Sequence, residues 1–280
     1  MSQPIRPQPA CTASASRRRR RPKAVVRLGL AVPLAALALA GCGSLRPAKG
    51  PLVVQTYKAD CAASQRTLVV LLPGVYSDPQ DFVRKGFIRE LRERHIAADA
   101  MLVDAHLGYY QNRSIATRLQ TDVIGPALAA GYRSVWLAGI SLGGFGALLH
   151  EELQPGQAAG LVLIAPYLGV KEMAPAIQDS GGLKRWQPPP GEDVNVRLWR
   201  WLQSYANQAS PSPPLYLGFG LEDRFAPSHQ LLAANLPPRQ VFTTAGGHDW
   251  PQWQQLWRQM LDTLPLPRCE APVTAAAPQR

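Results

Sequence analysis

The chain has 280 residues, of which 46% are hydrophobic and 18% charged, and a formal net charge of +11. This composition is that of an ordinary globular protein and excludes disorder, collagen and a coiled coil as descriptions of the whole chain. Residues 1–41 hold 8 of the 30 Lys and Arg residues and none of the 19 acidic residues, which leaves 22 basic against 19 acidic, a net +3, for the rest. A basic, nucleic-acid-binding body is therefore excluded.

The N-terminal segment combines a basic stretch with a short apolar run. Basic residues gathered between Arg17 and Arg27 precede residues 28–40, which consist of Leu, Ala, Val, Gly and one Pro. The run is shorter than the roughly 20 residues that a membrane-spanning helix needs and has the length of a signal-peptide core. It ends in Leu39-Ala40-Gly41-Cys42, which resembles the bacterial lipobox. The resemblance implies cleavage before Cys42, attachment of lipid to its sulfur, and a membrane-anchored lipoprotein of the bacterial cell envelope.

Two alternatives stay open for this segment. One is a cytosolic protein whose basic N-terminal arm binds nucleic acid or acts in targeting. The other concerns the membrane: Gly43 follows the cysteine, and the absence of Asp at this position leaves the outer membrane open as the destination.

The four cysteines differ in their expected environment. Cys11 lies in the segment expected to be removed, and Cys42 carries the lipid. Cys61 and Cys269 remain, close to opposite ends of the folded part. Because cysteines in an oxidising compartment pair, we expect a disulfide between these two.

Beyond the N-terminus, short apolar runs alternate with longer segments of helical period. This alternation predicts a mostly parallel sheet built from βα units. The predicted strands are residues 52–57, 67–72, 99–103, 134–140, 161–165, 214–219 and 240–244. The predicted parts are a removed signal peptide, a lipidated tether rich in Gly and Pro, a folded domain and a flexible tail, over residues 1–41, 42–51, 52–270 and 271–280.

Four helices have readable beginnings or ends. We expect one to begin at Asp78-Pro79, with Asp78 as its cap, and to bury a stripe that runs to Leu91. The others are expected over residues 114–130, from Ser141 onward, and over 250–264, the last with its tryptophans in the core.

Residues 169–213 interrupt the alternation. They contain Gly- and Pro-rich stretches around one amphipathic segment, residues 194–208. We interpret them as a small helical cap over a site, with an ordinary helical connection as the alternative. Trp186, Trp199 and Trp201 in this insertion either meet a hydrophobic substrate group or close the insertion's own core.

One motif carries chemistry. Gly139-Ile140-Ser141-Leu142-Gly143 matches G-x-S-x-G and stands between a predicted strand and a predicted helix. A tight turn at this point exposes the serine oxygen, and the helix N-terminus directs free N–H groups at an incoming oxyanion. Here the chain resembles the α/β-hydrolase family over nearly all of residues 52–264. The resemblance implies an α/β-hydrolase fold, with a mostly parallel, doubly wound sheet and flanking helices, and a triad with Ser141 as nucleophile.

The resemblance extends to an oxyanion hole and a substrate pocket. Residues 71–76 follow an early strand at the place of the family's H-G-x loop, with Pro73 in place of the common His. It implies the N–H groups of Val75 and Leu142 as donors. The candidates for the pocket are Tyr76, His106 and Tyr109, with a structural role for His106 equally open.

The acid and the base are expected after later strands. The strand at 214–219 runs into Gly220-Leu221-Glu222-Asp223. Asp223 fits the family's G-x-x-D pattern, with Glu222 as the alternative. His248 follows Gly246-Gly247 and is the expected general base. A neutral imidazole would take the proton of Ser141, and an acyl-serine would then be hydrolysed by water.

The other histidines are expected elsewhere. His95 and His229 are predicted at the surface, and His150 in a packing or surface role. No His or Cys cluster has metal-ligand spacing, and no G-x-G-x-x-G joins a strand to a helix. We therefore expect neither a metal nor a nucleotide cofactor.

These features lead to three functional hypotheses. The first is a lipid-anchored serine hydrolase, carboxylesterase-like, that cleaves an ester or related acyl bond in a small-molecule substrate. The second keeps the triad but acts on a thioester or an amide. The third is a catalytically silent lipoprotein that uses the fold as a binding module. All three attach to a membrane through Cys42, and none binds nucleic acid.

Overall fold

The computed structural model describes residues 46–61, 63–207 and 212–269. The predicted signal peptide, Cys42 as the predicted site of lipidation, and the predicted C-terminal tail lie outside the described residues. Within these ranges, no helix combines the length and the apolar character needed to cross a membrane.

The centre of the domain is a seven-stranded sheet. Its strands are β1 (Val54–Tyr57), β2 (Thr67–Leu72), β3 (Ala98–Val103), β4 (Ser134–Ile140), β5 (Gly160–Ile164), β6 (Leu215–Gly220) and β7 (Val241–Thr244). The predicted strands are confirmed, with ends displaced by at most two residues. Strands such as β2, buried at every residue, are recognisable because both faces of the sheet are covered and the run is continuously apolar.

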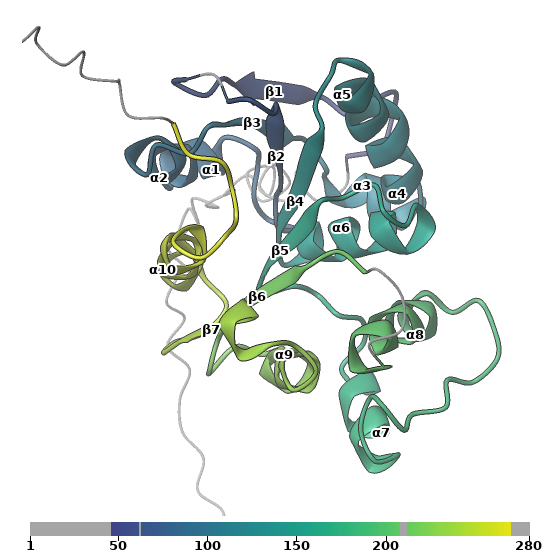
Figure 1. The fold of residues 1–280 in the computed structure, drawn as a ribbon. Helices are drawn as coiled ribbons and strands as arrows, with labels where there is room; N and C mark the ends of the chain where they lie inside the picture. Colours follow the sequence, from purple (N-terminus) through teal and green to yellow (C-terminus); the bar gives the residue numbers. More distant parts are fainter. Residues whose placement is uncertain (1–45, 62, 208–211, 270–280) are drawn as a thin grey trace, which may run out of the picture. The chain divides into compact units, whose positions relative to one another are not determined.

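The strands are ordered β1-β3-β2-β4-β5-β6-β7 (Figure 1). All neighbours are parallel except β1 and β3, which are antiparallel with Val54 opposite Val103. The carboxyl ends of β2 to β7 therefore lie along one edge of the sheet. We call this edge, with the loops that follow these strands and the residues up to Val54 at the start of β1, the carboxyl edge. In sheets of this kind ligands bind at that edge.

Helices cover both faces of the sheet. On one face, α1 (Asp81–Arg84), α2 (Phe87–Glu93) and α10 (Trp250–Leu261) lie together, and α3 to α6 lie on the other (Figure 1). Each face of the sheet carries its own hydrophobic core. The elements that pack into the core on the face of α3 to α6 are α3 (Leu107–Gln111), α4 (Ile115–Arg118), the π-helical segment η2 (Leu119–Ile124), α5 (Gly125–Ala129), α6 (Leu142–Leu153), α7 (Met173–Asp179), α8 (Val194–Asn207) and α9 (Ala226–Ala233). A short 3-10 turn, η3 (Pro238–Gln240), precedes β7. The predicted doubly wound arrangement is confirmed.

Two helix predictions need correction. The single helix expected from Asp78-Pro79 is two short helices, because Gly86 adopts φ +82° and turns the chain between α1 and α2. Asp78 does not cap α1: its Oδ1 accepts the Gln80 N–H at 2.7 Å in a turn before the helix. The helix expected over 114–130 contains the π segment η2 and ends before Gly131 as predicted.

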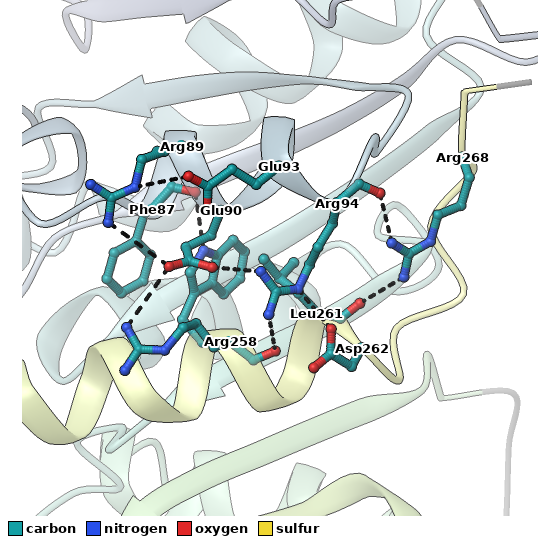
Figure 2. A network of polar contacts seen from close by, with 10 residues as sticks. Phe87, Arg89, Glu90, Glu93, Arg94, Arg258, Leu261, Asp262 and Arg268 are labelled. Carbon is teal, nitrogen blue, oxygen red and sulfur yellow. Dashed lines mark hydrogen bonds and ion pairs between the residues drawn. The ribbon is translucent and has the colours of Figure 1, made fainter. Parts of the chain in front are cut away.

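Charged side chains join α2 to α10 and to the end of the domain (Figure 2). The buried carboxylate of Glu90 accepts a bond of 2.5 Å from Arg94 and lies 3.8 Å from Arg258. Arg94 also binds Asp262, and Arg268 donates to the Arg94 carbonyl at 2.7 Å. This network holds the C-terminal segment against the helices on this face.

A disulfide closes the domain. The structure joins Cys61 to Cys269, the pair expected from the sequence, with a Cα–Cα distance of 5.8 Å over a separation of 208 residues. The N–H of Cys269 donates to the carbonyl of His95 at 2.7 Å, directly after α2. Segments from the two ends of the domain are therefore held together covalently.

The segment expected to be a tether is partly folded onto the domain. From residue 46 onward it packs on α3: the Arg46 side chain binds Asp104, and the Pro51 carbonyl accepts the Tyr109 hydroxyl at 3.3 Å. The N–H of Leu52 donates to Asp122 at 2.9 Å. Residues 46–51 of the predicted tether are therefore in contact with the folded domain.

The described parts of the insertion at 169–213 pack into the same core as α3 to α6. Trp199 in α8 is fully buried, and its indole N–H donates to the Leu168 carbonyl at 2.8 Å. Gln203 donates to the carbonyl of Trp186, which is also buried, at 2.7 Å. Of the two alternatives for the tryptophans, packing holds for Trp186 and Trp199, whereas Trp201 is half-buried against Tyr205.

Candidate active site

Ser141 stands at a strained turn between β4 and α6. Its backbone has φ 51° and ψ −113°, a region that residues other than glycine rarely adopt. The turn is held by the Ser141 N–H, which donates to Ile164 at 3.0 Å, and by the Ser141 carbonyl, which accepts from Tyr167 at 2.9 Å. Such strain persists only where neighbouring structure enforces it, and it is common at functional sites.

A glycine makes this turn sterically feasible. A Cβ atom on Gly143 would lie 2.1 Å from the carbonyl oxygen of Leu72 at the end of β2. No side chain fits at that distance, so the first turn of α6 approaches the sheet only because residue 143 is glycine. The small residues of the motif thus allow the close contact of helix and strand expected from the sequence.

Loops after β4, β6 and β7 bring three polar side chains together. His248 Nε2 lies 2.9 Å from Ser141 Oγ, and His248 Nδ1 lies 2.7 Å from Asp223 Oδ2. Ser141 and His248 are 107 residues apart in the chain and meet because the parallel strands end at one edge. The side chain of Asp223 is fully buried, and 10% of the His248 side chain is exposed.

The environment of Asp223 favours its ionised form. Burial opposes ionisation, but hydrogen bonds from His248 and from the Phe225 N–H, the latter at 2.8 Å, outweigh it and hold the pKa of this carboxyl below its usual value. Glu222, the alternative acid, is exposed and accepts the Gly246 N–H instead. The structure therefore brings Asp223, and not Glu222, to the histidine.

Two aromatic rings hold the imidazole of His248. Phe225 and Trp253 meet it edge to face, with ring centroids at 5.2 Å and 5.1 Å. The sequence pattern predicts a core position for Trp253 and gives no role to Phe225. The one signal for Phe225 was its position two residues after the acid, in the loop expected to carry the triad.

The expected oxyanion donors lie beside the nucleophile. A Cβ atom built on Gly74 would be 3.6 Å from Ser141 Cβ, so the loop that contains Val75 passes next to the serine. Leu142 is the first residue of α6. Among the described residues, neither the Val75 nor the Leu142 N–H donates to a backbone carbonyl, and both are free to bind an oxyanion.

The three candidates for the substrate pocket have different environments. Tyr109 is buried in the core, so the pocket role expected for it is wrong. His106 caps α3 by accepting the Gly108 N–H on Nδ1 at 3.2 Å and packs on the ring of Tyr109, which is the structural alternative. Burial, with the nearby charge of Arg46, lowers the pKa of His106. Tyr76 is 87% exposed at the carboxyl edge.

The remaining histidines divide between surface and core. His95 is exposed, as predicted. The surface prediction for His229 is wrong: α9 turns it toward the sheet, where it is fully buried and its Nε2 bonds the Pro166 carbonyl at 2.8 Å. His150 is also fully buried, with Nε2 at 2.9 Å from Gln120. Burial lowers the pKa of His150 and of His229 to about 4.

Over the ranges that the structure describes, no group of three or more His, Cys, Asp or Glu side chains is arranged to hold a metal ion.

Comparison with known proteins identifies the fold. No protein-family model matches the chain, and no curated protein matches its sequence. Among solved structures, S-formylglutathione hydrolase of Staphylococcus aureus has 14% identity and a TM-score of 0.52, covering 78% of this chain and 97% of that one. FphF, a fluorophosphonate-binding serine hydrolase of the same species, has 15% identity and a TM-score of 0.51, covering 76% and 98%. Est1E of Butyrivibrio proteoclasticus, solved with ferulic acid, has 12% identity and a TM-score of 0.50, covering 76% and 95%.

The chain has the α/β-hydrolase fold. Within this fold, Ser141, Asp223 and His248 follow β4, β6 and β7. This is the chain order, serine then acid then histidine, that the sequence resemblance implied.

Proposed function

We propose that the protein is a serine hydrolase that cleaves a carboxylic ester of a small-molecule substrate. The observation that carries the proposal is the continuous hydrogen-bonded chain from Ser141 through His248 to Asp223. A hydroxyl is a weak nucleophile at neutral pH, and this chain supplies the base that it needs. The three structurally similar proteins include two hydrolases, one of them a fluorophosphonate-binding serine hydrolase, which supports the same chemistry.

The proposed reaction has two halves. Ser141 Oγ attacks the ester carbonyl while His248 Nε2 takes its proton, and Asp223 stabilises the imidazolium that forms. The tetrahedral oxyanion accepts hydrogen bonds from the Val75 and Leu142 N–H groups. The intermediate collapses to acyl-Ser141, and His248 returns the proton to the departing alcohol. A water molecule, deprotonated by His248, then releases the acid and restores the serine.

The decisive test is reaction with a fluorophosphonate, followed by intact mass. The wild type should gain one adduct, and Ser141→Ala and His248→Ala should gain none, because one removes the nucleophile and the other its base. Ser114→Ala is the matched control: Ser114 also precedes a helix, α4, but no His ring bonds its hydroxyl among the described residues. That variant should label like the wild type.

A folded wild type that gains no adduct would contradict the proposal and favour a binding protein without catalysis. If Ser141 is labelled, the turnover of matched ester, thioester and amide substrates tests which kind of bond the enzyme cleaves. The proposal of an ester substrate fails if the thioester or the amide with the same acyl group is cleaved faster than the ester.

We also infer that Cys42 is lipidated and anchors the protein in a membrane of the bacterial cell envelope. The support is the basic stretch, the short apolar run and the Leu39-Ala40-Gly41-Cys42 sequence. A disulfide between Cys61 and Cys269 suits an oxidising compartment. Cys42→Ser should leave the chain unprocessed or release it from membranes in an alkaline wash. Equal recovery of this variant and the wild type in washed membranes would refute the anchor.

A further inference from the structure

The chain enters the folded domain at the carboxyl edge. The Arg46 side chain binds Asp104, which directly follows β3. The Arg46 carbonyl lies against α3, where a Cβ atom on Gly108 would be 2.2 Å from its oxygen. Both contacts are to residues that follow the carboxyl end of β3. The first described residue is therefore fixed at the same edge that carries Ser141.

Little chain separates this point from the expected lipid. Cys42 and Arg46 are four residues apart. An extended chain advances at most about 3.6 Å per residue, so Arg46 stays within about 14 Å of the lipid-bearing residue. If Cys42 sits at the membrane surface, the part of the carboxyl edge around Arg46 is held close to it.

Exposed apolar side chains gather at this edge. The structure has eight large hydrophobic side chains that are exposed within the described ranges, and five of them belong to the carboxyl edge. These five are Val53 and Val54 at the start of β1, Tyr76 after β2, Val170 after β5 and Leu221 after β6. Single exposed apolar residues are ordinary, but a majority along one edge of a sheet needs an explanation.

Two of these apolar residues lie beside the entry point of the chain. Arg46, Val53 and Val54 line one shallow cavity of about 320 Å³, whose other lining residues include the charged Asp78, Arg84 and Asp104. Val53 is 69% exposed, although its backbone carbonyl is fixed by the Asp104 N–H at 2.9 Å. A rigid backbone thus presents an apolar side chain to solvent next to the point where the chain comes from the lipid.

We propose that the carboxyl edge is the surface that faces the bilayer, and that Ser141 acts on an ester carried in the lipid phase. The proposal rests on the anchor and on the esterase function proposed above. A short tether brings the apolar side chains to the membrane surface, where they replace contact with water by contact with lipid. Tyr76, adjacent to the Val75 donor, combines an apolar ring with a hydroxyl, a side chain suited to the interface.

The first experiment compares a lipid-borne ester with a soluble one. The full chain, purified from bacterial membranes, is placed in phosphatidylcholine vesicles that contain p-nitrophenyl palmitate, and its rate is divided by its rate on aqueous p-nitrophenyl acetate. Val53→Asp should lower this ratio about tenfold, because a charge at this position resists contact with the apolar phase.

The matched control is Leu153→Asp. Leu153 is 46% exposed but ends α6, which runs away from the carboxyl edge. Its ratio should stay within about twofold of the wild type if only that edge meets lipid. A ratio for Val53→Asp equal to the wild type, or an equal fall for Leu153→Asp, would overturn the proposal. A wild type that hydrolyses the acetate but not the palmitate would overturn its substrate half.

The second experiment does not depend on activity. Hydrogen exchange of Ser141→Ala in vesicles is compared with that of the same protein carrying Cys42→Ser. Peptides that contain Val53, Tyr76 and Leu221 should be protected only in the lipidated form, whereas the peptide around Leu153 should exchange equally in both. Protection of these peptides, together with a wild type that hydrolyses neither ester in the first experiment, would mean that the esterase proposal fails while the orientation stands. Hydrolysis by the wild type without protection of these peptides would refute the proposed orientation. A purified chain whose mass shows no lipid would refute it as well.

Discussion

At the scale of single residues, the site depends on which carboxylate faces His248. Asp223 and Glu222 are adjacent, and only Asp223 is buried. Asp223 is buried and bonds the imidazole, whereas Glu222 bonds a backbone N–H of the neighbouring Gly246 loop. Asp223 thus positions the imidazole of His248, and Glu222 positions the backbone of the loop at Gly246.

We predict that Asp223→Asn lowers kcat about 10⁴-fold, because an amide stabilises the wrong tautomer of the imidazole and cannot balance its charge. Glu222→Gln should change kcat by less than about threefold, since an amide oxygen still accepts the Gly246 N–H. Steady-state rates on a soluble ester measure both. A comparable loss in the two variants would mean that the acid has been misassigned.

At the scale of elements, the junction of β4 and α6 depends on two backbones in close contact. Gly143 packs its Cα against the carbonyl of Leu72, and Ser141 stands at positive φ two residues earlier. The short apolar strands and the motif at their junction were predictable because both are local patterns. The break between α1 and α2 was not, since apolar residues on either side of Gly86 keep the helical period.

We expect Gly143→Ala to lower the free energy of unfolding by more than about 3 kcal/mol, or to prevent folding, because the new methyl group meets backbone. Gly146→Ala, in the same helix, is the control: the nearest atom to its Cβ, at 2.6 Å, is the Tyr110 hydroxyl at the end of a side chain. Its cost should be clearly smaller. Urea denaturation compares the two, and equal losses would count against the close contact as the cause.

At the scale of the whole molecule, stability depends on a covalent bond between the two ends of the domain. The disulfide closes a loop of 208 residues, so its removal enlarges the unfolded ensemble. We predict that Cys61→Ser with Cys269→Ser lowers the free energy of unfolding by about 5 kcal/mol. Urea titration with and without reductant provides the measurement: reductant should destabilise the wild type alone. A wild type that is indifferent to reductant would contradict the prediction.

Acid should destabilise the fold through two buried histidines. Burial lowers the pKa of His150 and His229 to about 4, against an ordinary value of 6.5. Between these values the unfolded chain binds protons that the native state does not, so stability falls as the pH falls from about 6.5 toward 4. At pH 5 each histidine should cost about 2 kcal/mol.

His150→Gln tests this expectation. The amide can still meet Gln120 but does not titrate, so the loss of stability between pH 7.5 and pH 5 should shrink by about 2 kcal/mol. His95→Asn, at an exposed position with positive φ, is the control and should leave the loss unchanged. A pH dependence of His150→Gln equal to that of the wild type would refute the assignment.

The sequence by itself determined where the strands lie along the chain, the serine at a strand-to-helix turn, and a histidine and an acid after later strands. These are consequences of apolar runs and turn residues within short windows. Only the tertiary structure decided that Asp223 and not Glu222 meets His248. It also decided that His229 and Tyr109 are buried and that residues 46–51 pack on α3. The reason is physical: parallel strands gather loops from distant parts of the chain at one edge, and which side chains face one another there depends on packing across the sheet and not on any local pattern.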